Sequence, residues 1–448
     1  MLYNFASLLL ATSVFGLHLS GPRLSSPLNA IDSVHVPKGL CDTVDSVSGF
    51  FPADDQGKKQ YFYWIFESRH DPQNDPIVLW MTGGPGCSSL IALFKEHGPC
   101  TIDKGGKTTT PNPWSWNQNA SIIYIDQPSG VGFSRGPGDE TGEWDVAPQA
   151  FKFLSSFFAS NQHLADNDFY IFGESYGGHF VPAVANYIHT ENKRGGGNSS
   201  ARINLKGIGI GNGLTDPVHQ YSMFPEFAHS NGYNQLVGDF SYKVMKNAIK
   251  PCLKLIAECE RGMKPMCFAA MEACNIVAMA PIQIRGLNVY DVRKNCDNPP
   301  LCYDFTDIGT FVNQPGVRKA LGLLPSDRAW QECNMMVNLL FFTDFMQTFA
   351  SNVASLLDDG LRVLIYAGQA DYICNWFGNR EWINLLEWNG KSEFNKAGQH
   401  DWIIMNKSVG TIQQYQNLTF ISIKDAGHMV PMDQPEVAQY LLNNFLNN

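Results

Sequence analysis

Short runs of apolar, often β-branched residues recur along this 448-residue chain and predict buried strands. The predicted strands are Ile77–Met81, Ile122–Ile125, Phe169–Phe172, Gly207–Ile210, Val363–Tyr366 and Thr419–Ile423. Helical stretches lie between some of them, at Ala147–Ser160 and Gly177–Thr190. Strands that alternate with helices indicate the α/β class of fold, with a largely parallel central sheet that helices cover on both faces.

The segment from about Leu214 to Asp344 interrupts this alternation. It has no comparable series of strands, and it contains a methionine-rich stretch and a cluster of cysteines. We therefore expect a core in two parts, over residues 41–213 and 345–448, and a mainly helical, disulfide-stapled insertion over residues 214–344.

The N-terminus carries an apolar stretch from Leu2 to Leu17 without any charged residue. This stretch is too short for a stable membrane span and is typical of a signal peptide, which we place at about residues 1–20. No later run reaches the length of a transmembrane helix, so we expect a soluble protein once the signal is removed. Sequons for N-glycosylation follow at Asn119, Asn198, Asn406 and Asn417, and the glycine-rich surroundings of Asn198 predict that it is the most exposed.

Composition narrows the possible partners. The chain is 44% hydrophobic and 17% charged, with a formal net charge of −10 and no basic block. Such a chain is a poor candidate for binding nucleic acid or anionic lipid. Eleven cysteines indicate an oxidising compartment. Because no Cys-x-x-Cys pair accompanies a histidine cluster, we expect no zinc site, and we expect no cofactor.

Four cysteines in the insertion are spaced almost symmetrically, and they are Cys252, Cys259, Cys267 and Cys274. Two helices that fold back on each other would pair the outer two and the inner two. Cys296 and Cys302 are close enough in sequence to close a small loop. The odd total leaves at least one thiol either free or paired outside the chain.

The strongest chemical signal is Gly173-Glu174-Ser175-Tyr176-Gly177, which follows a predicted strand and precedes a predicted helix. A strand, a tight turn and a helix are the context of a nucleophile elbow, in which the serine oxygen is exposed at the carboxyl end of the sheet. A bare G-x-S-x-G also occurs in ordinary glycine-rich turns. The flanking elements favour catalysis, and we predict that Ser175 is a nucleophile.

A serine nucleophile needs a base and an orienting acid, in the chain order Ser, Asp or Glu, His for this architecture. Asp371 and His428 each follow a predicted strand, so both should lie at the same sheet edge as the serine. Asp425 is a rival acid, but it is three residues from the histidine and is better suited to shaping the turn. We expect His179 and His400 to have packing or surface roles.

The chain also resembles the serine carboxypeptidases, a family with an α/β-hydrolase core and a cap inserted after about the sixth strand. Four segments carry the resemblance: Trp80-Met-Thr-Gly-Gly-Pro-Gly-Cys-Ser-Ser-Leu90, Gly173-Glu-Ser-Tyr-Gly-Gly-His179, Ile365-Tyr-Ala-Gly-Gln-Ala-Asp-Tyr-Ile-Cys-Asn-Trp376 and Gly427-His-Met-Val-Pro431. Shorter similarities occur in Asp126-Gln-Pro128, Gly211-Asn-Gly213 and Asn288-Val-Tyr-Asp-Val-Arg293. Together they span roughly residues 45 to 445.

The resemblance implies that Ser175, Asp371 and His428 form the family's catalytic triad. It also implies that the backbone N–H groups of Gly84 and Tyr176 form the oxyanion hole. Two such donors aimed at the tetrahedral oxygen are typically worth ~3–4 kcal/mol each in the activation barrier.

A clamp for the substrate's terminal carboxylate is the second implication, made of Glu96, Glu174, Trp80 and the Gly83 backbone. An Asn of the yeast members is Thr82 here, a shorter donor that changes the geometry of the clamp. Two carboxyl groups in contact cannot both ionise easily, so one pKa should rise above the usual value of about 4.3. A protonated glutamate can then donate a hydrogen bond to the substrate, which predicts best activity on peptides at acid pH.

Disulfides complete the resemblance. It implies a bond from Cys87 to Cys333, the pairs Cys252–Cys274, Cys259–Cys267 and Cys296–Cys302 in the cap, and a free thiol at Cys374. Cys41 and Cys100 then remain, and we expect them to pair with each other.

We therefore predict a serine-type carboxypeptidase that acts on the C-termini of peptides and proteins. An acyltransferase on the same scaffold is an alternative, because acceptor choice depends on pocket shape, and so is a protective or scaffold role for partner proteins. We expect a monomer or homodimer in the secretory pathway, either secreted or vacuolar or lysosomal.

Overall fold

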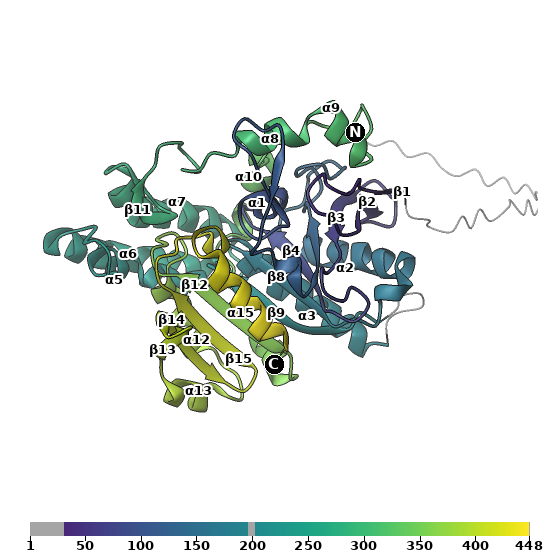
Figure 1. Ribbon diagram of the computed structural model, residues 1–448. Helices are drawn as coiled ribbons and strands as arrows, with labels where there is room; N and C mark the ends of the chain where they lie inside the picture. Colours follow the sequence, from purple (N-terminus) through teal and green to yellow (C-terminus); the bar gives the residue numbers. More distant parts are fainter. Residues whose placement is uncertain (1–30, 196–201, 448) are drawn as a thin grey trace, which may run out of the picture.

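The computed structural model describes residues 31–195 and 202–447 of the chain (Figure 1). The predicted signal peptide and the sequon at Asn198 lie outside the described residues. Within the described part, one large sheet has eleven strands in the order β1-β2-β3-β7-β4-β8-β9-β12-β15-β14-β13.

The six predicted strands are the six adjacent parallel strands at the centre of this sheet. They are β7 (Ser121–Ile125), β4 (Ile77–Thr82), β8 (Phe169–Glu174), β9 (Leu205–Gly211), β12 (Arg362–Gly368) and β15 (Leu418–Ile423). Every residue of β7 and β8 is buried, as expected for strands covered on both faces.

Antiparallel strands extend both edges of the parallel centre, and the apolar-run pattern did not predict them. They are β1 (Ile31–His35), β2 (Ser46–Pro52) and β3 (Gln60–Phe66) at one edge, and β14 (Lys407–Tyr415) and β13 (His400–Ile404) at the other. β3 is rich in aromatic residues, and β13 and β14 mix polar with apolar residues and are only partly buried, so none of the three forms a continuous aliphatic run.

Each face of the sheet has its own hydrophobic core. Leu79 packs in one core with α2 (Glu143–Ser160), α3 (Gly177–Lys193) and α11 (Ala350–Asp358). Its neighbour Trp80 packs in the other core, with α1 (Leu90–Lys95) and α15 (Pro435–Asn447). Successive residues of a strand point to opposite faces, and this alternation fixes which side chains reach each core. The helices α12 (Trp376–Leu385), α13 (Lys391–Ala397) and α14 (Val430–Asp433) complete the covering.

The cap follows β9, and the large sheet resumes at β12. Its helices are α4 (Pro217–Ser222), α5 (Phe224–His229), α6 (Asp239–Glu260), α7 (Lys264–Gln283), α8 (Thr306–Val312), α9 (Pro315–Ala320) and α10 (Met335–Leu340), with a 3₁₀ turn, η4 (Phe341–Thr343). Two small hairpins, β10–β11 (Leu287–Asn288 and Asp291–Asn295) and β5–β6 (Cys100–Ile102 and Thr109–Pro111), lie outside the large sheet. Figure 1 shows α5, α6 and α7 together on one side of the sheet, with α8, α9 and α10 above it.

Five disulfides join the cysteines: four in the pairs that the resemblance implies, and Cys41–Cys100 as expected for the two that remained; Cys374 is free and buried. The pairs are Cys41–Cys100, Cys87–Cys333, Cys252–Cys274, Cys259–Cys267 and Cys296–Cys302. Two of them staple α6 to α7, which form the helical hairpin expected from the cysteine spacing.

One expectation about α7 was wrong. This helix is long and apolar enough, by length and composition alone, to cross a membrane, although no run after the N-terminus was expected to be. Its charges, Lys264 and Glu272, are few, and its hydropathy is spread over the whole helix rather than concentrated in one run. Only a third of the apolar window is buried, so much of this helix presents apolar side chains to its surroundings.

The three described sequons differ in accessibility. Asn406 is exposed in the turn between β13 and β14. Asn119 is half-buried, and the Asn417 amide donates a hydrogen bond to the Gly360 carbonyl at 2.9 Å. Among these three, Asn406 is the best placed for a glycan.

Candidate active site

Ser175 lies at the sharp turn between β8 and α3 with a φ of 62°, in the left-handed region that few residues other than glycine adopt. Its carbonyl accepts hydrogen bonds from the backbone N–H groups of Gly178 and Leu214, both at 2.9 Å. These bonds hold the strained turn in place. The conformation is that of a nucleophile elbow.

A second glycine-rich loop, after β4, packs directly against this elbow. A Cβ atom on Gly83 would lie 2.4 Å from the Tyr176 nitrogen and 2.9 Å from the Ser175 Cβ. A Cβ on Gly173 would lie 2.5 Å from the Met81 carbonyl oxygen. Only glycine allows the two loops to approach this closely, which brings the backbone next to the nucleophile.

His428 and Asp371 come from the loops after β15 and β12, which pair in parallel. The His428 Nδ1 lies 2.8 Å from the Asp371 Oδ2, and both residues are almost completely buried. Asp371 also accepts hydrogen bonds from the Asn212 amide at 2.8 Å and from the backbone N–H groups of Ile373 and Cys374, both at 3.2 Å. These donors fix the carboxylate, and the carboxylate fixes the histidine ring.

Sequence reasoning gave Asn212 no role. It has a φ of 40°, and its side chain links the backbone N–H of Gly368 to the Asp371 carboxylate. The Gly211-Asn-Gly213 similarity contained the signal, since an asparagine between two glycines is suited to such a turn.

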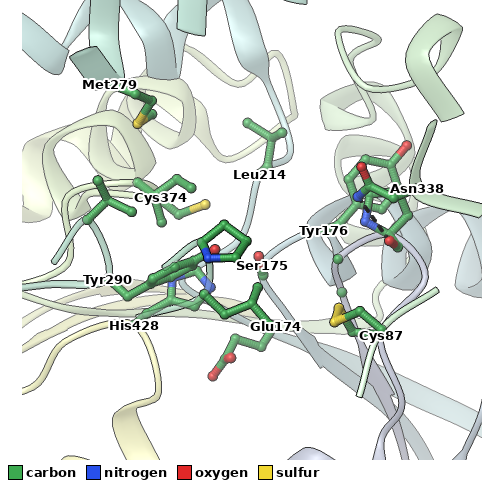
Figure 2. A pocket seen from close by; sticks show the side chains of 18 of the residues that line it. Cys87, Glu174, Ser175, Tyr176, Leu214, Met279, Tyr290, Asn338, Cys374 and His428 are labelled. Carbon is green, nitrogen blue, oxygen red and sulfur yellow. Dashed lines mark hydrogen bonds between the residues drawn. A yellow bond between two sulfur atoms is a disulfide. The ribbon is translucent and has the colours of Figure 1, made fainter. Parts of the chain in front are cut away.

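Ser175 and His428 line one cavity of about 520 Å³ between the sheet edge and the cap (Figure 2). Figure 2 shows His428 and Tyr290 on one side of Ser175 and Cys87 on the other. The lining is largely apolar. Buried residues such as Glu174 form its floor, whereas exposed cap residues form its mouth.

Gly84 and Tyr176, expected to form the oxyanion hole, both line this cavity. Tyr176 precedes the first residue of α3, where helix N–H groups point toward developing negative charge. Its side chain is buried and donates a hydrogen bond from its hydroxyl to the Asp344 carboxylate. Tyr176, the expected oxyanion donor, is thus held through its side chain as well as through its backbone.

Asp344 connects this tyrosine to a second buried carboxyl group. Its other oxygen accepts a hydrogen bond from the backbone N–H of Glu143 at 3.2 Å, at the start of α2. Burial raises the pKa of Asp344 to about 7, and burial together with Asp344 raises the pKa of Glu143 well above its ordinary value. Sequence reasoning identified neither residue, because their meeting depends on how the cap rejoins the core.

Glu96 and Glu174 form the buried carboxyl pair that the resemblance implies. Both line the cavity floor, at 5% and 4% exposure, and their carboxyl groups share a hydrogen bond. Burial, with the charge of Glu96, raises the pKa of Glu174 well above its ordinary value, and burial raises that of Glu96 to about 7. Because a hydrogen bond between carboxyl groups needs a proton, the pair holds at least one at acid pH.

The other expected clamp residues divide into two kinds. Thr82 and Gly83 line the cavity beside the glutamates. Trp80 was expected to belong to the clamp, but it is fully buried and is absent from the cavity lining in the described part of the chain. Its indole N–H donates to the Thr82 hydroxyl oxygen at 2.9 Å. Trp80 therefore orients the threonine from behind, because its strand position points it into the core.

Cys374 lines the cavity near the triad. Burial raises the pKa of its thiol well above the ordinary value, so the thiol stays protonated and is a poor nucleophile. Its sulfur and ligand atoms of Asp371 and His428 all lie within 4.8 Å of one another. A soft metal ion bound by these three groups would take the His428 ring as a ligand.

The remaining sequence expectations concern groups outside the triad. Asp425 has a φ of 54° in the turn before His428, which fits the turn-shaping role expected of it. His179 is buried and stacks on Tyr176, with ring centroids 4.3 Å apart, as expected for a packing role. His400 is exposed on the edge strand β13.

Comparisons with known proteins agree with this geometry. A family model described as serine carboxypeptidase matches residues 37–448. The carboxypeptidase Y of Candida albicans is 40% identical over 443 residues, covering 98% of this chain and 80% of that protein. The carboxypeptidase Y of Komagataella phaffii is 42% identical over 414 residues, covering 91% and 76% respectively.

Among solved structures, Kex1 from Saccharomyces cerevisiae, a prohormone-processing carboxypeptidase, superposes with a TM-score of 0.79 at 27% identity, over 90% of this chain and 91% of that one. The match spans the core and the cap alike. It agrees with the α/β-hydrolase fold expected from the sequence. The chain belongs to the serine carboxypeptidase family.

Proposed function

We propose that the protein releases C-terminal amino acids from peptides and proteins, with Ser175, His428 and Asp371 as its catalytic triad, and that it acts best at acid pH. The observation that carries the proposal is the position of the Glu96–Glu174 pair. It lies on the floor of the cavity that Ser175 and His428 line. A protonated carboxyl pair in a buried floor binds a terminal carboxylate and leaves no room for a chain that continues.

The reaction follows from these positions. The Ser175 oxygen attacks the carbonyl carbon of the last peptide bond while His428 takes its proton. The oxyanion accepts hydrogen bonds from the backbone N–H groups of Gly84 and Tyr176. The C–N bond then breaks as His428 returns the proton to the leaving amino acid, and a water molecule hydrolyses the acyl-enzyme ester by the same steps in reverse.

An acid compartment of the secretory pathway suits this chemistry. Five disulfides favour an oxidising environment. The clamp pair needs its proton, and its raised pKa values keep that proton bound at mildly acid pH. We therefore infer a vacuolar, lysosomal or secreted enzyme.

The test is release of the last amino acid from an N-blocked dipeptide at pH 5, compared with the same dipeptide carrying a C-terminal amide. We expect rapid release from the free acid, slow release from the amide and no release by Ser175→Ala. Transfer of the acyl group to an added alcohol in preference to water would favour the acyltransferase alternative. Equal cleavage of acid and amide would contradict the carboxylate clamp.

A further inference from the structure

We propose that an apolar face of the cap binds the polypeptide upstream of the scissile bond, so that the enzyme selects substrates with apolar C-terminal segments. This inference rests on the proposed function, because only a carboxypeptidase holds its substrate with the C-terminus at the floor of the cleft. The face, named here the cap apolar face, consists of Phe268 and Ile276 of α7 and of Met335, Met336, Leu339 and Phe342 of α10 and η4.

These six side chains are large, apolar and exposed, from 37% for Phe342 to 67% for Met336. They belong to one surface because α7 packs against η4, and the rings of Phe268 and Phe342 meet with centroids 6.0 Å apart. Soluble proteins rarely gather this much apolar surface without a binding role.

The cap apolar face is continuous with the cleft. Ile276 and Met335 belong to it and also line the cavity, from α7 and α10 respectively. The floor of the cavity is closed by the buried Glu96 and Glu174. A substrate held by its C-terminus at that floor must therefore leave through the mouth, to which the exposed Ile276 and Met335 belong.

The dimensions fit an extended peptide. Phe268 and Ile276 lie eight residues apart on one helix, a rise of about 12 Å. About four residues of extended chain cover that length. A substrate of roughly seven residues therefore reaches from the clamp across the cap apolar face.

The chemistry of the face defines the partner. Methionine is flexible and polarisable, so Met335 and Met336 adapt to different apolar side chains without demanding one sequence. Glu272 lies between Phe268 and Ile276 on α7 and lines the mouth. This carboxylate disfavours acidic residues upstream in the substrate, and it also makes α7 a poor surface for anionic membranes.

The experiment compares two N-blocked heptapeptides that end in the same dipeptide. One has five upstream residues alternating Leu and Ala, the other alternating Ser and Gly, and the N-blocked dipeptide itself is the reference. For wild type we expect kcat/KM to be about tenfold higher for the Leu peptide than for the Ser peptide, because its KM is lower. A tenfold difference corresponds to about 1.4 kcal/mol of apolar contact. In Met336→Ser with Leu339→Ser, the ratio should fall to about two while dipeptide cleavage is unchanged.

Ile403→Ser is the control, since Ile403 is an exposed apolar residue, at 52% against 56% for Leu339, on β13 at the far edge of the sheet. A wild-type ratio near one, or a ratio that the cap double variant leaves unchanged, would overturn the proposal. Two other results would also overturn it. One is that phosphatidylcholine–phosphatidylserine vesicles bind wild type but not the double variant. The other is that wild type is a dimer and the double variant is a monomer. Failure to cleave even the dipeptide would instead count against the proposed function.

Discussion

The hydroxyl of Tyr176 donates a hydrogen bond to the carboxylate of Asp344, two residues that are 168 positions apart in the sequence. One of them carries a proposed oxyanion donor, and the other lies where the cap returns to the core. Asp344 also accepts from the Glu143 N–H at the start of α2. A single carboxyl group in the cap thus ties Tyr176, the proposed oxyanion donor, to a core helix.

A double-mutant cycle tests whether this bond positions the oxyanion donor. Removing an oxyanion-hole donor costs about 10²–10³ in kcat, and we expect a displaced one to cost about tenfold. Asp344→Ala and Tyr176→Phe should each lower kcat about tenfold with little change in KM, and the double variant should be no slower than Tyr176→Phe. Asp344→Asn keeps an acceptor and should restore most of the activity.

Tyr61→Phe is the matched control for that cycle, because the buried Tyr61 hydroxyl donates to Gln149 of α2 and does not touch the elbow. It should leave kcat unchanged. If the effects of Asp344→Ala and Tyr176→Phe on kcat multiply in the double variant, then Asp344 has only a general structural role.

The carboxyl pair predicts how KM depends on pH. As pH rises through about 7, the pKa of Glu96, the pair loses the first of its two protons and gains a negative charge that repels the substrate carboxylate, while Glu174, whose pKa is raised further, keeps its proton longer. KM for free-acid peptides should therefore rise above neutral pH. In the double variant Glu96→Gln and Glu174→Gln, the side chains stay neutral, so KM should hardly change between pH 5 and 8. A variant profile that rises as steeply as that of wild type would refute the role of the pair.

Thr82 should matter for binding and not for chemistry. Thr82→Val removes the hydroxyl that lies at the clamp and accepts the Trp80 indole N–H. Losing a hydrogen bond to a charged group costs about 1.5–3 kcal/mol, so KM for free-acid peptides should rise tenfold or more with kcat unchanged. Thr82→Asn restores a donor and should bind more tightly than Thr82→Val. A fall in kcat without a rise in KM would indicate instead that Thr82 takes part in the chemical step.

Folding stability should be higher at mildly acid pH than at neutral pH. Five buried carboxyl groups have raised pKa values, each mainly through burial: Glu96, Asp126, Glu143, Glu174 and Asp344. Such a group binds its proton more tightly in the folded state, so the stability that it contributes is lost as pH rises from its unfolded to its folded pKa. The slope is about 1.4 kcal/mol per pH unit for each group.

Two buried histidines act in the opposite direction. Burial lowers the pKa of His179 to about 4 and that of His97 well below its ordinary value, so both favour the folded state as pH rises toward 6.5. The carboxyl groups outnumber them. The melting temperature should therefore fall between pH 5 and pH 7, and Glu143→Gln should flatten this fall while the exposed Glu393→Gln should not. A melting temperature that rises toward pH 7 would contradict this balance.

Much of the fold followed from local sequence signals. The six central strands are continuous apolar runs, because both of their faces are buried. The edge strands escaped prediction because their sequences form no aliphatic run. Gln60–Phe66 is buried but mostly aromatic, and Lys407–Tyr415 mixes polar with apolar residues and is only partly covered. The α6–α7 hairpin was predictable from the symmetric cysteine spacing.

The site was predictable where a motif carried the chemistry. Ser175, Asp371 and His428 each follow a strand, and parallel strands deliver them to one sheet edge. Asp344 was not predictable, since nothing near it in the sequence shows that it meets Tyr176. The placement of Trp80 behind Thr82 likewise depends on which face of β4 it occupies in the folded sheet.

The most direct test of the central claim is the ratio of kcat/KM for an N-blocked dipeptide and its C-terminal amide, measured at pH 5 and at pH 8. If a protonated Glu96–Glu174 pair makes this serine hydrolase a carboxypeptidase, the free acid should be preferred at least tenfold at pH 5, and the preference should shrink at pH 8 as the pair ionises. A preference for the free acid that is equal at both pH values, or absent at pH 5, would contradict the account.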